Sequence, residues 1–349
     1  MIPRVILGIE TSCDETAAAI VIDGKPVADR TTTQVLHEEF GGVVPELASR
    51  AHERLLMPAV EGVLRDAKLQ VGDIDGIAVT YGPGLAGALL VGVAFAKGLG
   101  LAKGIPVWGV NHIEGHLWSG GLTSETPPLP FLALIISGGH TLLIEVEGFG
   151  KYRKVGTTRD DAVGELFDKA GRMIGFSFPA GARIDAAALA FTGEPVAFPR
   201  TRIECEPNNF SFSGLKTAVL YHLQRTYKRG EDGAFNLTEE QRNAICAGLM
   251  SAVGGTLAAA VRSALSQRDY RALVVAGGVS ASRYLRRVFT EVTDDAGILL
   301  IIPPFQHCTD NGSMIAYAGY LRILNGFPPS DLKLSVDPAA SLFSAAPLG

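Results

Sequence analysis

The sharpest chemical signal in the chain is a pair of histidines four residues apart, His112 and His116. On a helix this spacing places both imidazoles on one face, where they can bind one metal ion. Asn111 is a good N-cap for such a helix, and Glu114 stands where a capping box has its acid. Metalloproteases with an HExxH motif need glutamate directly after the first histidine, and Ile113 stands there instead. The spacing predicts a metal site that lacks the general base of a protease; two ordinary surface histidines are the alternative.

A third ligand would come from far along the chain, and Asp310 is the candidate. It lies in the polar segment 306–312, directly after the apolar, strand-like run 298–304, so we expect it at a strand end. Two histidines and one carboxylate leave coordination positions open for a substrate oxygen, and iron(II) or zinc suits such a set. On local grounds Asp310 could equally be the N-cap of the next helix.

A glycine-rich segment, residues 137–141, separates two apolar runs that are typical of strands. Gly138 and Gly139 carry no Cβ, so successive backbone N–H groups could approach an anion such as a phosphate. A hairpin turn that needs positive φ would explain the two glycines equally well. A second segment, 277–280, could let a flat nucleoside lie against the backbone, or it could be a plain turn from strand to helix.

Four acidic residues elsewhere could take part in the same chemistry. Asp14 and Glu15 lie at the predicted tip of the first hairpin, where a carboxylate can organise a metal, a water molecule or an amine; solvated turn residues are the alternative. Asp168 falls near the apolar side of a helical stretch, and Asp185 precedes an alanine-rich helix. Carboxylates there could bind ribose hydroxyls. Their structural alternatives are a pair with Arg172 for Asp168 and a helix start for Asp185.

Two β-hairpins must position these residues. Segments 5–23 and 131–147 each read as an apolar strand, a polar or glycine-rich turn and a second strand. Strands and helices alternate after each hairpin, and strands 76–81 and 272–276 both lead into glycine before a helix. This pattern predicts an α/β protein with sites at strand ends, and the repeated hairpin predicts two similar lobes around a cleft.

Composition narrows the class of protein. The 349 residues suffice for two domains, and a hydrophobic content of 47% excludes a disordered chain. The net charge of −5 excludes a generally basic, nucleic-acid-coating protein, although basic clusters at 151–154, 225–229 and 283–287 could still follow a phosphate backbone. Four scattered cysteines and no signal-peptide pattern predict a cytoplasmic protein. The apolar stretch 244–261 is interpreted as a buried helix, so no membrane partner is expected.

Six segments that occur in order together resemble one family. They are GIETSCDET (8–16), GGVVPELASRAH (41–52), NHIEGH (111–116), SGGHT (137–141), FSFSGLK (210–216) and TDN (309–311). Each is weak alone, but their joint occurrence, from about Arg4 to Leu324, is similar to the bacterial tRNA N6-adenosine threonylcarbamoyltransferase (TsaD) family. The resemblance implies a two-lobed actin/Hsp70/sugar-kinase-like ATPase fold, which agrees with the two hairpin-led halves.

The resemblance also implies an activity. This is transfer of the threonylcarbamoyl group from threonylcarbamoyl-adenylate to N6 of adenosine-37 in tRNAs that read codons beginning with A, with release of AMP. By position it implies His112, His116 and Asp310 as ligands of one divalent metal, iron(II) or zinc, and Asp14 as a catalytic residue. The implied nucleotide and acyl-adenylate contacts are Ile135, Ile136, Ser137, Gly138, Gly139, Asp168, Gly181, Asp185 and Ser282.

The two hairpin-led halves predict a domain organisation. Residues 1–128 with about 305–327 would form an N-terminal lobe and 129–304 a C-terminal lobe, and the Pro/Ser/Ala-rich segment 328–349 would be a surface tail. The partners that the resemblance implies are tRNA and TsaB-like and TsaE-like proteins. The helical stretch 89–101, rich in alanine, glycine and leucine, could form an interface or be an ordinary core helix.

The chain departs from the family pattern at two places. Ser282 stands where the family commonly has asparagine, and Ala180-Gly181-Ala182 stands where it has Gly-Gly-Pro. Serine can still donate a hydrogen bond but reaches less far. The alternative functions are a metal-dependent peptidase and a kinase or ATPase on the same fold, because a fold does not determine an activity.

Overall fold

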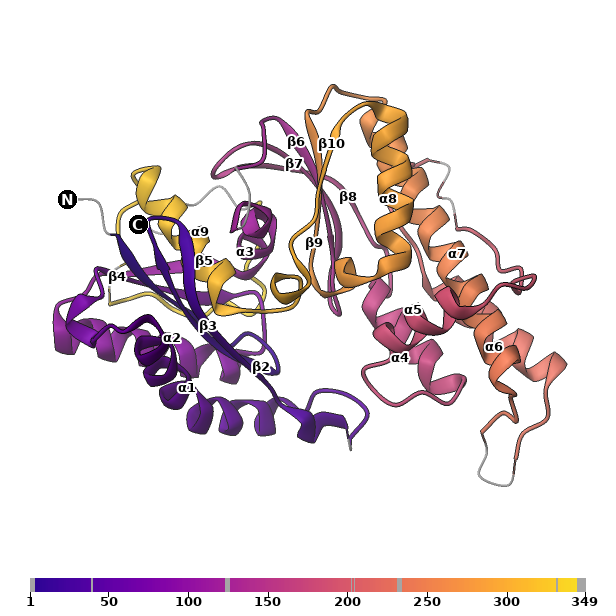
Figure 1. Ribbon diagram of the computed structural model, residues 1–349, viewed down its shortest axis with the longest axis horizontal. Coiled ribbons are helices and arrows are strands. Elements are labelled where there is room, and N and C mark those ends of the chain that lie inside the picture. Colours follow the sequence, from indigo (N-terminus) through magenta and orange to yellow (C-terminus); the bar gives the residue numbers. More distant parts are fainter. Residues whose placement is uncertain are drawn as a thin grey trace. The chain divides into compact units, whose positions relative to one another are not determined.

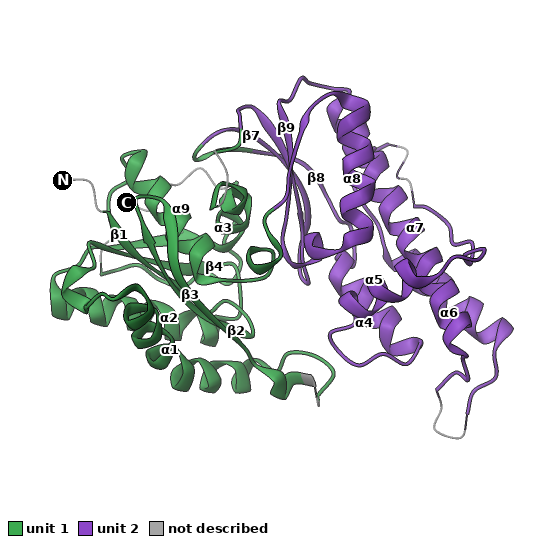
Figure 2. Ribbon diagram, in the orientation of Figure 1, with its two compact units in different colours: residues 1–127, 149–152, 303–349 green, residues 128–148, 153–302 purple. Residues whose placement is uncertain are grey.

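The computed structural model describes residues 4–38, 40–122, 126–201, 203, 205–230, 234–330 and 332–343 (Figure 1). The chain divides into two compact units (Figure 2). Unit 1 comprises residues 1–127, 149–152 and 303–349, and unit 2 comprises residues 128–148 and 153–302. Each unit has its own five-stranded sheet and apolar core, so the predicted α/β class is confirmed.

Unit 1 is built on a mixed sheet of order β3-β2-β1-β4-β5. β1 pairs antiparallel with β2, which pairs antiparallel with β3, whereas β4 and β5 continue parallel to β1. The first predicted hairpin is therefore confirmed, with its tip between Glu10 and Glu15. The strands are β1 (Val5–Glu10), β2 (Glu15–Ile22), β3 (Lys25–Thr33), β4 (Gly76–Gly82) and β5 (Val107–Asn111). The helices are α1 (Pro45–Ala67), α2 (Ala86–Lys103), α3 (His112–Trp118) and α9 (Gly312–Leu324), with 3-10 turns η1 (Val35–Glu38), η2 (Val71–Asp73), η3 (Ser119–Leu122) and η5 (Phe305–His307).

Alternation along β1 assigns the helices of unit 1 to opposite faces of its sheet (Figure 1). Leu7 and Ile9 belong to one apolar cluster with residues of α1 and α2. Gly8, between them, faces α9, where an added Cβ would lie 2.3 Å from the carbonyl oxygen of Gly312. Glycine at this position therefore lets α9 pack directly on the sheet, which brings the start of α9 close to β1 and β2.

Unit 2 repeats the same plan with a sheet of order β10-β9-β6-β7-β8. β6 pairs antiparallel with β7 and parallel with β9, as β1 does with β2 and β4, so the duplicated hairpin is confirmed. The strands are β6 (Phe131–Ile136), β7 (Thr141–Gly148), β8 (Lys151–Thr157), β9 (Ala272–Ala276) and β10 (Leu299–Ile301). The helices are α4 (Val163–Met173), α5 (Gly181–Ala190), α6 (Ser213–Thr226), α7 (Glu239–Leu265) and α8 (Arg283–Ala296), with the 3-10 turn η4 (Gly278–Ala281).

Among the residues that the structure describes, two helices are long and apolar enough to cross a membrane, α2 and α7. In α7, 72% of the apolar window is buried inside the protein, and Ile245, Leu249 and Leu257 of this helix belong to the core of unit 2. This is the buried helix that the sequence predicts for 244–261. In α2 only 33% of the window is buried.

The segment after α9 is attached to unit 1 by backbone contacts. Ser330 N–H donates to the carbonyl oxygen of Val107 over 2.8 Å, and Asp337 N–H donates to that of Tyr81 over 2.9 Å. Leu334 is 7% exposed and joins the core cluster of unit 1. The described part of the predicted surface tail therefore lies against β4 and β5.

Candidate active site

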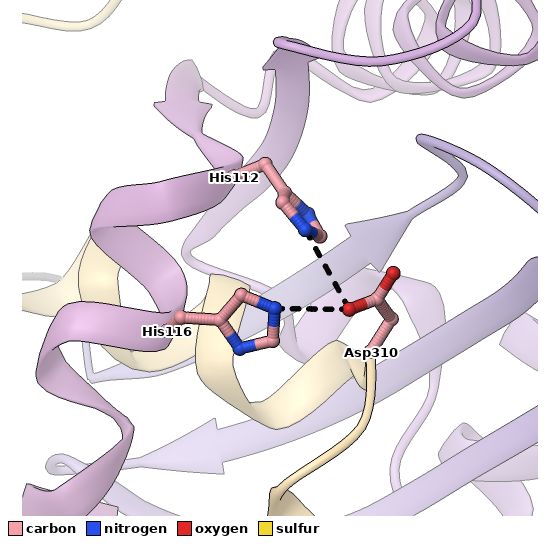
Figure 3. A group of neighbouring side chains, drawn as sticks. All are labelled: His112, His116 and Asp310. Atoms are coloured by element: carbon pink, nitrogen blue, oxygen red, sulfur yellow. Dashed lines mark ion pairs between the residues drawn. The ribbon is translucent and has the colours of Figure 1, made fainter. Parts of the chain in front are cut away.

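Helix α3 carries both histidines of the HxxxH segment on one face, as the spacing predicts (Figure 3). It begins immediately after β5, and the side chain of Asn111 accepts a hydrogen bond from Ile113 N–H over 2.9 Å, which confirms Asn111 as the N-cap. Strand β5 and this cap fix the direction in which the first turn of α3 leaves the sheet. His112 and His116 are 6% and 0% exposed, so they are not surface histidines.

Glu114 does not complete a capping box, contrary to the sequence prediction. Its carboxylate accepts hydrogen bonds from Tyr152 Oη over 2.9 Å and from Arg322 Nη1 over 2.7 Å. Glu114 is buried, and a buried carboxylate is stable only with charged or polar partners, which the N-cap backbone alone would not supply. These contacts tie α3 to α9 and to the segment 149–152.

Asp310 lies beside the two histidines. Its Oδ1 is 3.5 Å from His112 Nε2 and 3.0 Å from His116 Nε2 (Figure 3). The N-cap of α9 is Asn311, whose side chain accepts from Met314 N–H over 2.8 Å, so the capping role weighed for Asp310 is wrong. One ligand atom from each of the three residues lies within 4.8 Å of the others.

The donor set fits a metal ion. His116 is fully buried, yet neither of its ring nitrogens has a hydrogen-bond partner among the described residues. Its Nε2 is close to the Asp310 carboxylate without hydrogen-bond geometry. A buried polar atom without a hydrogen-bond partner lowers the stability of the folded state by about 1–3 kcal/mol. A cation bound by the ring nitrogen lone pair would remove this loss. Imidazole and carboxylate donors suit iron(II) and zinc.

Several carboxyl groups crowd this region and raise the pKa of their neighbours. Glu10 at the end of β1 is fully buried, and its Oε2 lies 3.0 Å from His112 Nδ1. Burial opposes protonation of His112, but the carboxylates of Asp310 and Glu10 raise the pKa of His112 to about 9. Burial, together with the charges of Asp310 and Asp14, raises the pKa of Glu15 to about 10. A divalent cation would be attracted by the carboxylates of Glu10 and Asp310.

Asp14 and Glu15 stand at the tip of the first hairpin, as predicted, and both are half-buried. The tip is held from below by His52 of α1, whose Nε2 lies 2.9 Å from the carbonyl oxygen of Cys13 and whose Nδ1 lies 2.8 Å from Thr16 Oγ1. Sequence analysis did not single out His52 or Glu10. His52 could have been noticed as a lone histidine among apolar positions of a helix, and Glu10 as an acid at the end of an apolar strand.

The glycine-rich tip of unit 2 rests on the start of α4. Gly164 N–H donates to the carbonyl oxygen of Ser137 over 3.2 Å, and Ser137 Oγ accepts from His140 N–H over 3.1 Å. Gly138 and Gly139 are exposed, neither has positive φ, and an added Cβ at either would meet nothing within 4 Å. The turn geometry considered as the alternative therefore does not require these two glycines.

The remaining predicted nucleotide contacts also lie in unit 2. Ile135 and Ile136 end β6, and Gly181 begins α5. Asp168 Oδ1 accepts from Ala180 N–H over 2.8 Å, directly before α5. Asp168 therefore binds the backbone just ahead of that helix.

Asp185 and Ser282 are brought into direct contact. Ser282 Oγ donates to Asp185 Oδ1 over 2.5 Å, and the backbone N–H groups of Arg283 and Tyr284 each donate to the same carboxylate over 3.1 Å. Asp185 lies inside α5 and binds the start of α8, so the alternative weighed for it, a place at the start of its own helix, is wrong.

Comparison with known proteins places this chain in a family. The family model described as TsaD, tRNA N6-adenosine threonylcarbamoyltransferase, matches residues 25–317. The chain belongs to this family. A tRNA N6-adenosine threonylcarbamoyltransferase of Neisseria meningitidis is 44% identical over 335 residues, covering 92% of this chain and 94% of the relative. One from Salinibacter ruber is 44% identical over 340 residues, covering 97% and 99%.

Solved structures confirm the fold. Component A of the (R)-2-hydroxyglutaryl-CoA dehydratase of Acidaminococcus fermentans aligns with a TM-score of 0.56 at 15% identity, over 92% of this chain and 99% of that one. HypF of T. kodakarensis aligns with a TM-score of 0.62 at 11% identity, over 93% of this chain and 48% of that one. The actin/Hsp70/sugar-kinase-like fold expected for the TsaD family is confirmed, and the chain is a tRNA-modifying transferase of that family.

Proposed function

We propose that this enzyme transfers the threonylcarbamoyl group from threonylcarbamoyl-adenylate to N6 of adenosine-37, in tRNAs that read codons beginning with A. The reaction centre would be one divalent metal, iron(II) or zinc, held by His112, His116 and Asp310. The observation that carries the metal centre is the convergence of these three side chains, together with the two ring nitrogens of His116, which have no hydrogen-bond partner among the described residues.

The reaction exchanges one bond to the carbamoyl carbon for another. The N6 amine attacks that carbon, a C–N bond forms, the C–O bond to the phosphate breaks and AMP leaves. When bound, the metal supplies Lewis-acid stabilisation of charge on the carbonyl oxygen. Asp14 would orient the N6 amine and take its proton, from a hairpin tip that His52 holds in place. Because an aromatic amine is a poor nucleophile, orientation has to supply much of the acceleration, on the order of 7–11 kcal/mol at best.

The adenylate would be bound by unit 2. The phosphate would be held by the backbone N–H groups of Ser137, Gly138 and Gly139. Both glycines are exposed, and this segment contacts the start of α4, where a helix N-terminus favours an anion. Asp168, Gly181, Asp185 and Ser282, with Ile135 and Ile136, would bind the nucleoside. Ser282 Oγ donates to Asp185, so these two side chains would face the nucleoside as a hydrogen-bonded pair.

TsaB-like and TsaE-like proteins would act as partners of this enzyme, beside the tRNA. On α2 the side chains of Leu90 and Leu101 are 57% and 71% exposed, which favours a helix-packed interface over a purely internal helix. A cytoplasmic location is proposed because all four cysteines are free thiols, as in reducing compartments.

The peptidase alternative is disfavoured by the site itself. Ile113 occupies the position of the general base, and the nearby Glu114 is engaged by Tyr152 and Arg322. A kinase or ATPase activity has only the fold in its favour.

Mass spectrometry of nucleosides tests the proposal. tRNA is incubated with threonylcarbamoyl-adenylate, this protein and its partner proteins, and then digested. Wild type should yield threonylcarbamoyladenosine, and His116→Ala should yield none while keeping its fold. Modification by His116→Ala at the wild-type rate without metal would refute the metal centre, and a wild type that yields no modified nucleoside would refute the activity.

A further inference from the structure

Glu10 is the one carboxylate in the described residues that faces His112 from the side opposite Asp310. Its Oε2 lies 3.0 Å from His112 Nδ1, whereas Asp310 Oδ1 lies 3.5 Å from His112 Nε2. We propose that Glu10 is the positioning residue of the metal centre, which holds His112 with a proton on Nδ1 and directs the Nε2 lone pair at the metal. This inference rests on the proposed metal centre.

Both oxygens of Glu10 are fixed by neighbours. Thr80 Oγ1, on β4, donates to Oε2 over 2.6 Å, and Ser12 N–H donates to Oε1 over 2.5 Å. Glu10 is 0% exposed, so water does not compete for these bonds. The carboxylate is therefore held in one orientation by β4 and by the tip of the first hairpin before any metal binds.

The orientation of Glu10 determines the state of His112. An ionised carboxylate can only accept, so the imidazole donates to Glu10 from Nδ1 over 3.0 Å. Ser12 Oγ, 3.2 Å from the same nitrogen, is a second and longer contact that can also accept from this N–H. In the neutral ring the lone pair is then on Nε2, the nitrogen that faces Asp310. A carboxylate behind a metal-binding histidine fixes the ring and makes it a stronger ligand, and loss of such a partner costs about 10- to 100-fold in metal affinity.

His116 has no equivalent support. Neither of its ring nitrogens has a hydrogen-bond partner in the described part of the chain. The two histidines are therefore unequal: His112 is fixed in advance by the sheet, and His116 is positioned by its helix and its packing. Preorganisation of the site comes from the His112 side.

Glu10 could instead serve only to connect β1 and β4 through Thr80, which would affect stability but not the metal. Metal titration separates these roles. Zn²⁺ or Co²⁺ is titrated into metal-free wild type, Glu10→Gln and the control Glu145→Gln, with affinity measured by chelator competition and the Co²⁺ absorption bands recorded. Glu145 is also a buried, multiply hydrogen-bonded carboxylate, but it lies in unit 2 on β7.

We expect Glu10→Gln to bind the metal 10- to 100-fold more weakly with altered Co²⁺ bands, and Glu145→Gln to bind as wild type does. Equal affinity and unchanged bands in Glu10→Gln, beside a wild type that binds, would overturn this inference alone. A wild type that binds no metal would overturn the metal centre and this inference with it.

A measurement on the wild type decides the matter if Glu10→Gln does not fold. Long-range proton–nitrogen NMR of the Zn²⁺-loaded protein reports which ring nitrogen of His112 carries the proton. A protonated Nδ1 and a metal-bound Nε2 are expected. A metal-bound Nδ1, or an Nδ1 without a proton, would overturn the proposal.

Discussion

Gly138 distinguishes two explanations of the glycine-rich segment 137–141, which are phosphate binding and a turn that needs positive φ. It has no positive φ, and an added Cβ would meet no atom of the described residues within 4 Å, so the fold of these residues does not require glycine there. If a phosphate lies against this backbone, a methyl group would obstruct it.

We predict that Gly138→Ala changes the free energy of unfolding by less than about 0.5 kcal/mol. It should weaken binding of the acyl-adenylate, or of AMP, by roughly 10- to 100-fold through loss of a charged hydrogen bond worth about 1.5–3 kcal/mol. Calorimetric titration with AMP and thermal unfolding measure the two effects. Gly277→Ala is the contrasting variant: with φ of +91° and an added Cβ 2.5 Å from the Ile136 carbonyl oxygen, it should lose more than about 1 kcal/mol of stability. Unchanged AMP affinity in Gly138→Ala would remove the phosphate role.

At the scale of the element, the stability of α3 depends on a buried ion pair to α9 in addition to its local cap. The side chains of Arg322 and Glu114 are 13% and 3% exposed and lie 2.7 Å apart, with Tyr152 on the second carboxylate oxygen. Seven residues make a short helix, which is marginal without tertiary contacts.

Arg322→Met should therefore destabilise the protein by about 3–5 kcal/mol, since it leaves Glu114 buried without its counter-charge. Denaturant unfolding gives the value. The exposed pair of Glu46 and Arg50 supplies the control, and Glu46→Gln should cost no more than about 0.5 kcal/mol. The double variant Glu114→Gln with Arg322→Met should recover part of the loss; a loss as large as the sum of the single variants would contradict the pairing.

The sheet of unit 2 has its own buried carboxylate. Hydrogen bonds from Arg153, set against burial, hold the pKa of Glu145 on β7 below its usual value, with help from Tyr270 and the charge of Arg268. A lowered folded-state pKa contributes stability above the unfolded-state pKa, and this contribution is lost as the pH falls through the folded-state value.

We therefore predict that Glu145→Gln is less stable than wild type at pH 7, and that the difference shrinks as the pH falls below about 4, the ordinary carboxyl range. Urea unfolding of both proteins across this pH range measures it. A stability difference that is constant with pH would show that the carboxylate charge is not the cause.

At the scale of the whole molecule, metal should stabilise one unit and not the other. All three proposed ligands lie in unit 1. A metal present at 100 times its dissociation constant adds about 2.7 kcal/mol to the state that binds it. Hydrogen exchange should slow in α3 and at the start of α9 when Zn²⁺ is added, with β6 to β10 unchanged. Protection confined to unit 2 would contradict this assignment.

The features that the sequence predicts arise from residues close together in the chain, whereas those that it misses join residues far apart in the chain. Neighbouring residues determine both hairpins and the helix at 112–118 with its cap, so local sequence patterns are enough to predict them. Glu10 meets His112 across 102 positions, and Glu114 meets Arg322 across 208. Asp185 accepts a hydrogen bond from Tyr284 N–H, 99 positions further along the chain, at the start of α8. The residues next to Asp185 in the sequence give no sign of this contact. Such pairings depend on sheet order and helix packing, which no local pattern encodes. Asp310 was found only because its residue type matched the chemistry that the histidines needed.

The most direct test of the account is the anomalous scattering of a metal-loaded crystal, recorded above and below the absorption edge of the metal. We predict one strong peak in unit 1, bonded to His112 Nε2, a ring nitrogen of His116 and a carboxylate oxygen of Asp310. A peak bound by other residues, or none at these three side chains at full metal occupancy in solution, would contradict it.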